Sequence, residues 1–304
     1  MTVSEVYDSF ILSRRLSGLS PKTVSGYVQF VSPFVSYAGS CRDYSSLSQQ
    51  DVNGWISSLL SRPLSRSSLA TYVRHVKIFL RWAESEYGTA SYSSASVRVP
   101  RSPRRSVRIY TDSEVSMIFS SVHASPEWVA SRNRCIIALM YDSGLRQSEV
   151  CGLLRSRLSL SDSRMVVSGK GGKERTVPIG SVSQRLLRCY LASCPYSPDL
   201  VFVGLHGQPL TCNAVKLFMS RMAASLPFEF SSHKLRHNFA TNYCLDQYER
   251  NGQVDIYRLM YLMGHEEVGT TRRYLHFAYE IISSRGCISH LDGILGNEKT
   301  APEA

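Results

Sequence analysis

Apolar residues recur every three or four positions along the first 90 residues, with polar residues between them. This spacing is typical of amphipathic helices that bury one face in a core. It predicts helices over residues 5–15, from 21 onward, after a Ser48–Asp51 capping pair, and over 69–87. Pro33 should bend or interrupt the second helix, because proline lacks the N–H that a helix interior needs. We therefore predict a small helical domain over residues 1–90.

The pattern stops between residues 88 and 108, where serines, Pro100 and Pro103 replace the apolar repeat. Segments of this composition usually connect domains. We assign residues 91–109 to a basic interdomain linker. Such a linker either follows a DNA backbone or forms a solvated tether, and its composition leaves both interpretations open.

The periodicity returns at Thr111 and Glu114, which form a second capping pair. Two short runs rich in β-branched residues, 165–167 and 175–179, predict strands that are joined by a glycine-rich hairpin loop. The second domain, residues 110–280, is therefore mainly α with a small β-sheet, and residues 281–304 form a tail. Its helices are predicted over residues 112–123, 131–142, 147–154, 182–192, 211–224, 232–246, 254–263 and 267–279.

The chain has 304 residues and a formal net charge of +11, which fits two domains and a polyanionic partner such as nucleic acid. A basic protein that merely stays soluble would have the same composition. No apolar run approaches the roughly 18 residues of a membrane span, and the N-terminus lacks a signal-peptide core. We therefore expect a cytoplasmic protein. The 8 cysteines contain no CxxC pair and are interpreted as reduced thiols.

Basic residues on the polar helix faces, in the linker and in the hairpin loop are candidate phosphate contacts. The same residues would equally make an ordinary solvated surface. They are Lys22, Arg66, Arg74, Lys77, Arg81, Arg101, Arg104, Arg105 and Lys173.

Two segments before residue 180 place cations where an anion could bind. Arg146 follows Gly144 and opens a helix, and a helix start with an arginine beside it suits an anion. Glu149, one turn later, would orient Arg146 or a histidine, or would simply favour the helix dipole. Lys170 lies at the tip of the glycine-rich hairpin, where it could reach a phosphate. The loop does not have the spacing of a nucleotide-binding P-loop.

The C-terminal part concentrates imidazole, guanidinium and phenol groups. His233 and Arg236 are three residues apart and share one helical face. His237 stands four residues after His233, but no HExxH glutamate and no third ligand accompany the pair, so we predict no metal site and interpret His237 as a packed, capping or supporting residue. His265 follows a glycine in a turn, and Tyr274 comes nine residues later. This set can hold a phosphodiester and attack its phosphorus with a side-chain oxygen.

In order and spacing, these residues resemble the tyrosine site-specific recombinase family, the phage-integrase and Xer group. The family signature is Arg…Lys…His-x-x-Arg…His/Trp…Tyr. The likeness covers about residues 110–280, and the N-terminal helices less specifically resemble the family's SAM-like core-binding domain. The matching positions are Arg146, Lys170, His233, Arg236, His265 and Tyr274, within the runs GLRQSEV, GKGGKERTVPI, HKLRHNFAT and MGHEEVGTTRRYLH.

The resemblance implies a C-shaped DNA clamp made of two domains, and strand transfer that needs no cofactor, neither ATP nor metal. Tyr274 would attack the scissile phosphate, leaving a 3′-phosphotyrosyl bond and a free 5′-hydroxyl. Arg146 and Arg236 would bind the non-bridging oxygens. Lys170 would protonate the leaving oxygen, His233 would assist proton removal from the phenol, and His265 would hydrogen-bond the phosphate.

The resemblance also implies a homotetramer on double-stranded DNA with paired recombination sites, which exchanges strands through a Holliday junction. The tail would dock into a neighbouring protomer, although its apolar residues would also fit an ordinary core. The sequence leaves open a mobile-element role, an Xer-type role and the involvement of accessory proteins. Two other classes remain as alternatives: a type IB topoisomerase with the same chemistry, and a catalytically idle DNA-binding regulator with the same fold.

Overall fold

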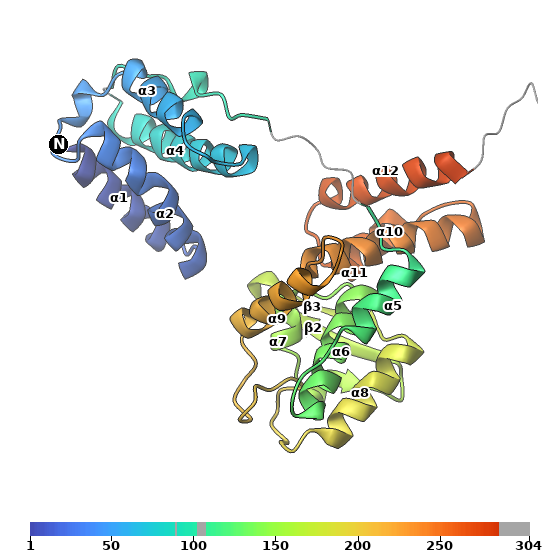
Figure 1. The fold of residues 1–304 in the computed structure, drawn as a ribbon. Helices are drawn as coiled ribbons and strands as arrows, with labels where there is room; N and C mark the ends of the chain where they lie inside the picture. Colours follow the sequence, from blue (N-terminus) through green and yellow to red (C-terminus); the bar gives the residue numbers. More distant parts are fainter. Residues whose placement is uncertain (89, 102–107, 286–304) are drawn as a thin grey trace, which may run out of the picture. The chain divides into compact units, whose positions relative to one another are not determined.

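The computed structural model describes residues 1–88, 90–101 and 108–285, and only the backbone of Lys170, Ser284 and Arg285. The chain divides into two compact units, Met1–Arg105 and Ser106–Ala304, which are described one at a time (Figure 1). The described part is mainly helical with one three-stranded sheet, which confirms the predicted fold class. None of its helices has the length and apolar character that crossing a membrane requires.

The first unit is a helical domain in which each long helix begins at a side-chain cap. The caps are hydroxyl groups that accept a hydrogen bond from the first helical turn, and the predicted Ser48–Asp51 capping box is present. Aromatic rings fill the core between the helices, with Phe10 against Phe79 and Phe34 against Trp55. The elements are α1 (Val3–Leu16), α2 (Pro21–Ala38), η1 (Tyr44–Ser46), α3 (Gln49–Leu60), α4 (Arg66–Tyr87) and η2 (Ser94–Ser96).

Helix α2 runs through Pro33 to Ala38, so of the bend or interruption predicted at this proline the interruption does not occur. Val31, Phe34 and Val35 lie on either side of the proline and are buried. Their packing holds the turn helical although one backbone N–H is missing, because most helix stability in a folded domain comes from the buried face.

The first half of the predicted linker is part of the N-terminal unit, which corrects the assignment of residues 91–101. Tyr92 and Val97 are buried in that unit's core. The Tyr92 hydroxyl lies 2.6 Å from the hydroxyl of Tyr44, and Lys77 Nζ donates to the Val97 carbonyl at 2.7 Å. Two apolar anchors fix this serine-rich segment, but two are too few to produce a periodic pattern.

The second unit combines helices with a small antiparallel sheet of order β1-β2-β3. Strand β2 pairs with β3 so that Met165 faces Val177. The elements are α5 (Asp112–Ser120), α6 (Glu127–Asp142), α7 (Gln147–Cys151), η3 (Arg155–Arg157), β1 (Leu158–Ser159), β2 (Arg164–Ser168), η4 (Lys170–Gly172), β3 (Glu174–Pro178), α8 (Ser181–Ser193), α9 (Cys212–Ser225), α10 (Ser232–Asn251), α11 (Ile256–Met263) and α12 (Val268–Arg285).

Two buried clusters position the chemistry of this unit. The larger one surrounds α6, which packs against α7, α8 and α10. The smaller one joins α10, α11 and α12 through Ala240, Cys244, Leu259, Met263 and Tyr274. Helices α10, α11 and α12 lie side by side in Figure 1. Parts of α10 and α12 that are distant in sequence, at Ala240 and Tyr274, are therefore brought together in one cluster.

Candidate active site

Arg146 stands at the start of α7, two residues after Gly144, whose φ is +65°. A side chain on Gly144 would clash with the Phe239 ring of α10, so only glycine allows this close approach. Arg146 Nη1 donates to Glu149 Oε1 at 2.8 Å, and Nη2 donates to the Gly264 carbonyl at 2.9 Å. These bonds tie the first arginine of the predicted site to the turn that follows α11.

Arg236 projects from α10 and is buried. Its Nη1 donates to the Gly144 carbonyl, its Nη2 donates to the Met263 carbonyl, and Nη2 also lies 3.3 Å from Nε2 of His265. The pKa of Arg236 falls to about 9, mainly because of burial and next because of the charge on Arg146. The two predicted arginines thus contact the same turn although 90 residues of sequence separate them.

Glu149 is the centre of the charge cluster. Its fully buried carboxylate accepts two hydrogen bonds from Arg175, at 2.8 and 2.9 Å, in addition to two from Arg146, one from Nη1 and one from the backbone N–H, both at 2.8 Å. Burial raises the pKa of Glu149, but the bonds and charge of Arg175 outweigh that effect and hold the pKa at about 2. The contacts of Glu149 support two of its possible roles, because it accepts both from the Arg146 side chain and from the Arg146 backbone N–H at the start of α7.

Arg175 was not predicted as a site residue. It comes from β3, is buried, and donates from Nε to the Leu262 carbonyl at 2.8 Å. The sequence held a signal for it, because Arg175 and the buried Val177 are two residues apart and therefore share one face of a strand. An arginine on the buried face of a strand needs an acidic partner, and the structure supplies Glu149.

His265 follows Gly264, which ends α11 in the left-handed conformation. Burial lowers the pKa of His265 to about 4, and nearby arginines, Arg236 first, lower it in the same direction. The ring is therefore neutral near pH 7. Because Arg236 is a donor only, Nε2 acts as the acceptor, and Nδ1–H donates to Thr271 Oγ1 at 2.8 Å.

Tyr274 lies on α12 with 2% of its surface exposed. Its hydroxyl is 2.8 Å from His237 Nδ1, and its ring stacks on the ring of His265 with centroids 6.3 Å apart. Burial raises the pKa of the phenol above its ordinary value, while Arg273 acts in the opposite direction. The pKa of His237 falls to about 4, mainly because of burial. A neutral imidazole thus holds a neutral phenol.

Two predicted residues, His233 and Lys170, have no described side-chain contact with the charge cluster around Glu149. His233 lies one helical turn before His237 on α10, is exposed, and its imidazole makes no hydrogen bond to another described residue. Lys170 begins the η4 turn at the hairpin tip, and its side chain lies outside the described part of the structure. A side chain on the preceding Gly169 would lie 3.7 Å from Arg175 Nη1, so the backbone at Lys170 borders the charge cluster.

The residues of this cluster open onto a pocket of about 720 Å³. Arg146, Arg175 and His265 line it, together with Lys173. The three guanidinium groups of Arg146, Arg175 and Arg236 surround one carboxylate and leave two positive charges in excess. Glu174, Glu266 and Glu267 also line the pocket, so the excess of positive charge belongs to the buried cluster and not to the pocket as a whole. A cluster with this charge suits a phosphate group.

Family models match both units. The phage integrase family matches residues 108–280, and the phage integrase N-terminal SAM-like domain matches residues 7–87. The chain belongs to the phage integrase family of tyrosine recombinases. It is 31% identical over 271 residues to a tyrosine recombinase XerC of Mesorhizobium japonicum, covering 84% of this chain and 85% of the relative. It is 33% identical over 272 residues to a tyrosine recombinase XerC of Methylobacterium sp., covering 84% and 83%.

Solved structures share the recombinase fold at low identity. The Tn1549 transposon integrase in complex with circular intermediate DNA superposes with a TM-score of 0.72 at 18% identity, over 94% of this chain and 100% of the other. A lambda integrase tetramer bound to a Holliday junction gives a TM-score of 0.70 at 18% identity, over 88% and 78%. At such identities the likeness establishes the fold alone.

The predicted DNA-contact residues remain predictions in this recombinase. Most of those that are described are exposed, as a phosphate contact requires. Lys77 differs from the prediction, because it is half-buried and donates to the Val97 carbonyl. Lys173 forms an exposed pair with Glu266 at 3.2 Å. Lys22, Arg66, Arg74, Arg81 and Arg101 are exposed, whereas Arg104 and Arg105 lie outside the described residues.

Proposed function

We propose that this protein is a site-specific DNA recombinase that cleaves and rejoins DNA through a phosphotyrosyl intermediate. The main observation behind this proposal is that Arg146, Arg236, His265 and Tyr274 meet around the turn at Gly264. Arg146 donates to the Gly264 carbonyl, Arg236 lies within hydrogen-bond distance of His265, and the Tyr274 ring stacks on the ring of His265. The family match and the XerC relatives support the same reaction class.

The proposed first step joins Tyr274 Oη to the scissile phosphorus and breaks the bond from phosphorus to the 5′ oxygen. The phenolic proton leaves Oη, and a proton reaches the departing 5′ oxygen from Lys170. The products are a 3′-phosphotyrosyl bond and a free 5′-hydroxyl. Attack by a 5′-hydroxyl of another strand reverses these changes, so rejoining needs no external energy source.

Arg146 and Arg236 would stabilise the charge that develops on the non-bridging oxygens. Both guanidinium groups are already fixed by carbonyl oxygens, so they need little rearrangement when the phosphate binds. Removing one such donor typically lowers the rate by about a hundredfold to a thousandfold. The excess of positive charge around Glu149 supports the same role.

Tyr274 is in a protected state in the free protein, because its hydroxyl is buried and bonded to His237. We propose that DNA binding releases the phenol from His237 and presents it to the phosphate, where His233 receives the proton. His265 would then turn Nε2–H toward the phosphate. That change requires the opposite tautomer from the one that Arg236 selects in the free protein.

More specifically, we propose that the protein acts as a homotetramer, which pairs two DNA sites and exchanges strands through a Holliday junction. The lambda integrase tetramer on a Holliday junction, which shares the fold, supports this assembly. The XerC relatives favour an Xer-type role over a mobile-element role. The predicted tail, residues 281–304, would link protomers. Its first residues, 281–285, belong to α12, and residues 286–304 lie outside the described part of the chain. A cytoplasmic location remains a prediction.

Covalent capture tests the proposal even though the target site is not known. The protein is incubated with a library of nicked duplexes from a bacterial genome, and complexes that survive SDS are recovered and sequenced. Tyr274→Phe should bind DNA in a gel shift but form no SDS-resistant complex. Tyr279→Phe, a matched change of an exposed tyrosine on the same helix, should bind DNA and also form the SDS-resistant complex. SDS-resistant complexes with Tyr274→Phe would exclude Tyr274 as the nucleophile.

The two alternative functions predict different outcomes in related assays. A topoisomerase would relax any supercoiled plasmid as a monomer, whereas the recombinase should capture a restricted set of sequences and assemble on them. A catalytically idle regulator would form no covalent complex even as wild type. Sequencing of the captured fragments therefore distinguishes all three functions and also identifies the recombination site.

A further inference from the structure

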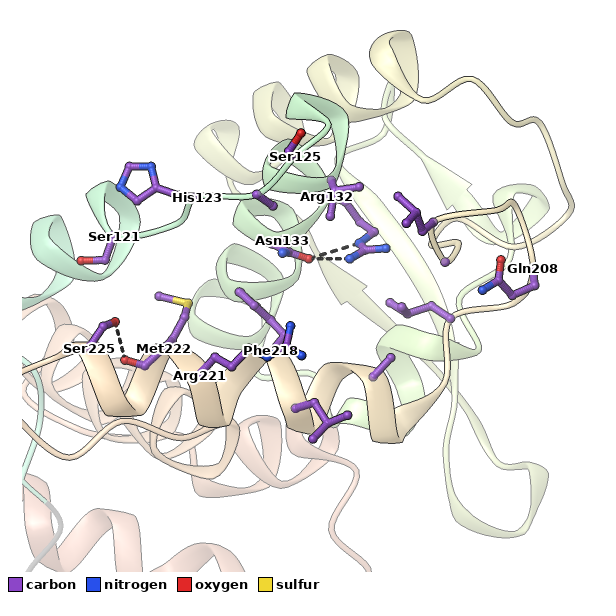
Figure 2. A pocket seen from close by; sticks show the side chains of 17 residues that line it. Ser121, His123, Ser125, Arg132, Asn133, Gln208, Phe218, Arg221, Met222 and Ser225 are labelled. Atoms are coloured by element: carbon purple, nitrogen blue, oxygen red, sulfur yellow. Dashed lines mark hydrogen bonds between the residues drawn. The ribbon is translucent and has the colours of Figure 1, made fainter.

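A second pocket lies in the C-terminal unit, away from the residues that line the pocket beside Arg146 and His265, which we call the catalytic pocket. Its volume is about 620 Å³, and its walls come from α6, α9, the loop before α6 and the loop around Gln208 (Figure 2). None of its lining residues is shared with the catalytic pocket. Val129, Phe218 and Met222 give it an apolar side, and Arg132 and Asn133 give it a polar floor.

Arg132 is buried at this floor, with 8% exposure, and Figure 2 shows its guanidinium pointing into the pocket. Nη1 donates to the Val203 carbonyl at 2.6 Å, while Nε and Nη2 donate to Asn133 Oδ1 at 3.2 and 2.9 Å. The guanidinium also lies 5.8 Å from the Trp128 ring. Arginine carries five N–H donors, so two of them have no acceptor among the described residues.

The charge of Arg132 is not matched by an acid. No Asp or Glu of the described chain forms an ion pair with it, and none lines the pocket. Within the described residues the other two buried arginines, Arg175 and Arg236, both lie beside Glu149. A buried cation without an anion is costly, and burial accordingly lowers the pKa of Arg132. A group from outside the pocket would remove that cost.

We propose that this pocket binds a carboxylate carried on an apolar body, with the carboxylate on Arg132 and the apolar part against Phe218 and Met222. Two unused N–H donors match the two oxygens of a carboxylate. A phosphate dianion would lose more hydration free energy against these apolar walls than a carboxylate would. Arg221, exposed on α9 at the pocket, adds a second positive charge toward an entering acid. This binding site does not depend on the proposed recombinase activity.

Ligand-observed fluorine NMR on the full-length protein tests the proposal with 4-fluorophenylacetate, and with its neutral amide as the control ligand. The acid should bind at least about tenfold more tightly than the amide, because hydrogen bonds to charged groups exceed neutral ones by about that factor. Asn133→Asp is the matched variant, since it places a carboxylate on Nε and Nη2 of Arg132 without a change of shape. It should weaken binding of the acid at least about tenfold, raise the melting temperature, and leave covalent capture of DNA unchanged.

Displacement of the fluorinated acid identifies the source of the natural carboxylate. One competitor is the peptide acetyl-Gly-Leu-Phe with a free C-terminal carboxylate, compared with its amidated form, and the other is unlabelled phenylacetate. Stronger displacement by the free peptide indicates a polypeptide ligand, and stronger displacement by phenylacetate indicates a small organic acid. The proposal is overturned if neither acid binds, if amide and acid bind equally, or if Asn133→Asp binds the acid like wild type. Displacement by inorganic phosphate at equal concentration would also refute it.

Discussion

Glu149→Gln tests whether one buried carboxylate holds the active site together. In the folded protein burial raises the pKa of Glu149, but the bonds and charge of Arg175 outweigh burial and bring the pKa to about 2, against an ordinary value of 4.5. At about 1.4 kcal/mol per pKa unit, this difference corresponds to about 3 kcal/mol of folding free energy. The neutral variant keeps the shape but leaves three guanidinium groups without a counter-charge. We expect it to lose about 3 kcal/mol of stability.

The pH dependence has a defined sign. The folded-state pKa of Glu149 lies below the unfolded value, so the stabilisation is fully present above pH 4.5 and is lost as the pH falls through about 2. The difference in stability between wild type and Glu149→Gln should therefore stay constant from pH 7 to pH 5. It should shrink only in strongly acidic solution.

Hydrogen exchange followed by mass spectrometry is the appropriate assay, because it reports the opening free energy of each unit separately. Peptides from α7 and β3 should exchange about a hundredfold faster in Glu149→Gln, while peptides from α1 to α4 should not change. Glu127→Gln is the matched control, since Glu127 pairs with Arg134 at 2.8 Å but is 76% exposed. It should change stability by less than about 1 kcal/mol. An equal effect of the two variants would refute the central role of Glu149.

Two further changes address the helix end and the histidines. Gly264→Ala places a methyl group 2.8 Å from Arg175 Nη1 at a φ of +57°. It should therefore destabilise the second unit. It should also lower covalent capture of DNA at least about tenfold, as expected when a reacting group is misplaced. Gly252→Ala, at a φ of +67° in open space, should show only the backbone strain of about 1–2 kcal/mol in thermal unfolding. Acidification from pH 7 to 5 should lower the melting temperature of the catalytic unit, because His237 and His265, with pKa values of about 4 against an ordinary 6.5, take up protons more readily when unfolded. His237→Gln should remove part of the pH dependence of the melting temperature. If the variant keeps the same pH dependence as wild type, the lowered pKa of His237 is contradicted.

The helices were predictable because their signals are local. Apolar spacing gave every long helix, and cap residues such as Thr111 fixed where several begin. The predictions failed where tertiary contacts decide the outcome. Pro33 stays within α2 because of packing on both sides, and Tyr92 anchors a segment whose composition is typical of a linker. Neither contact leaves a trace in the spacing of apolar residues.

The candidate site was predictable as a set of residues and not as a set of contacts. The signature located Tyr274 and both arginines, but it gave no reason to place His237 on the phenol. A weak signal existed, because His237 stands three residues before Ala240 and seven before Cys244, which puts it on the face of α10 that packs on α12. The spacing between His233 and His237 does not identify a partner for His237, because it does not show which helix packs on that face of α10.

The end of α11 explains why two distant arginines converge. The last carbonyl groups of a helix have no partner within the helix, and Gly264 ends α11 in the left-handed conformation. Arg236 binds the carbonyl of Met263, and Arg146 binds that of Gly264. Each guanidinium thereby satisfies a helix end through one edge and, among the described residues, keeps N–H donors without a protein acceptor. In the proposed mechanism a phosphate would bind those remaining donors while the carbonyl bonds persist, so the arginines would be aligned before DNA binds. Disturbing the turn should consequently affect cleavage more than DNA binding.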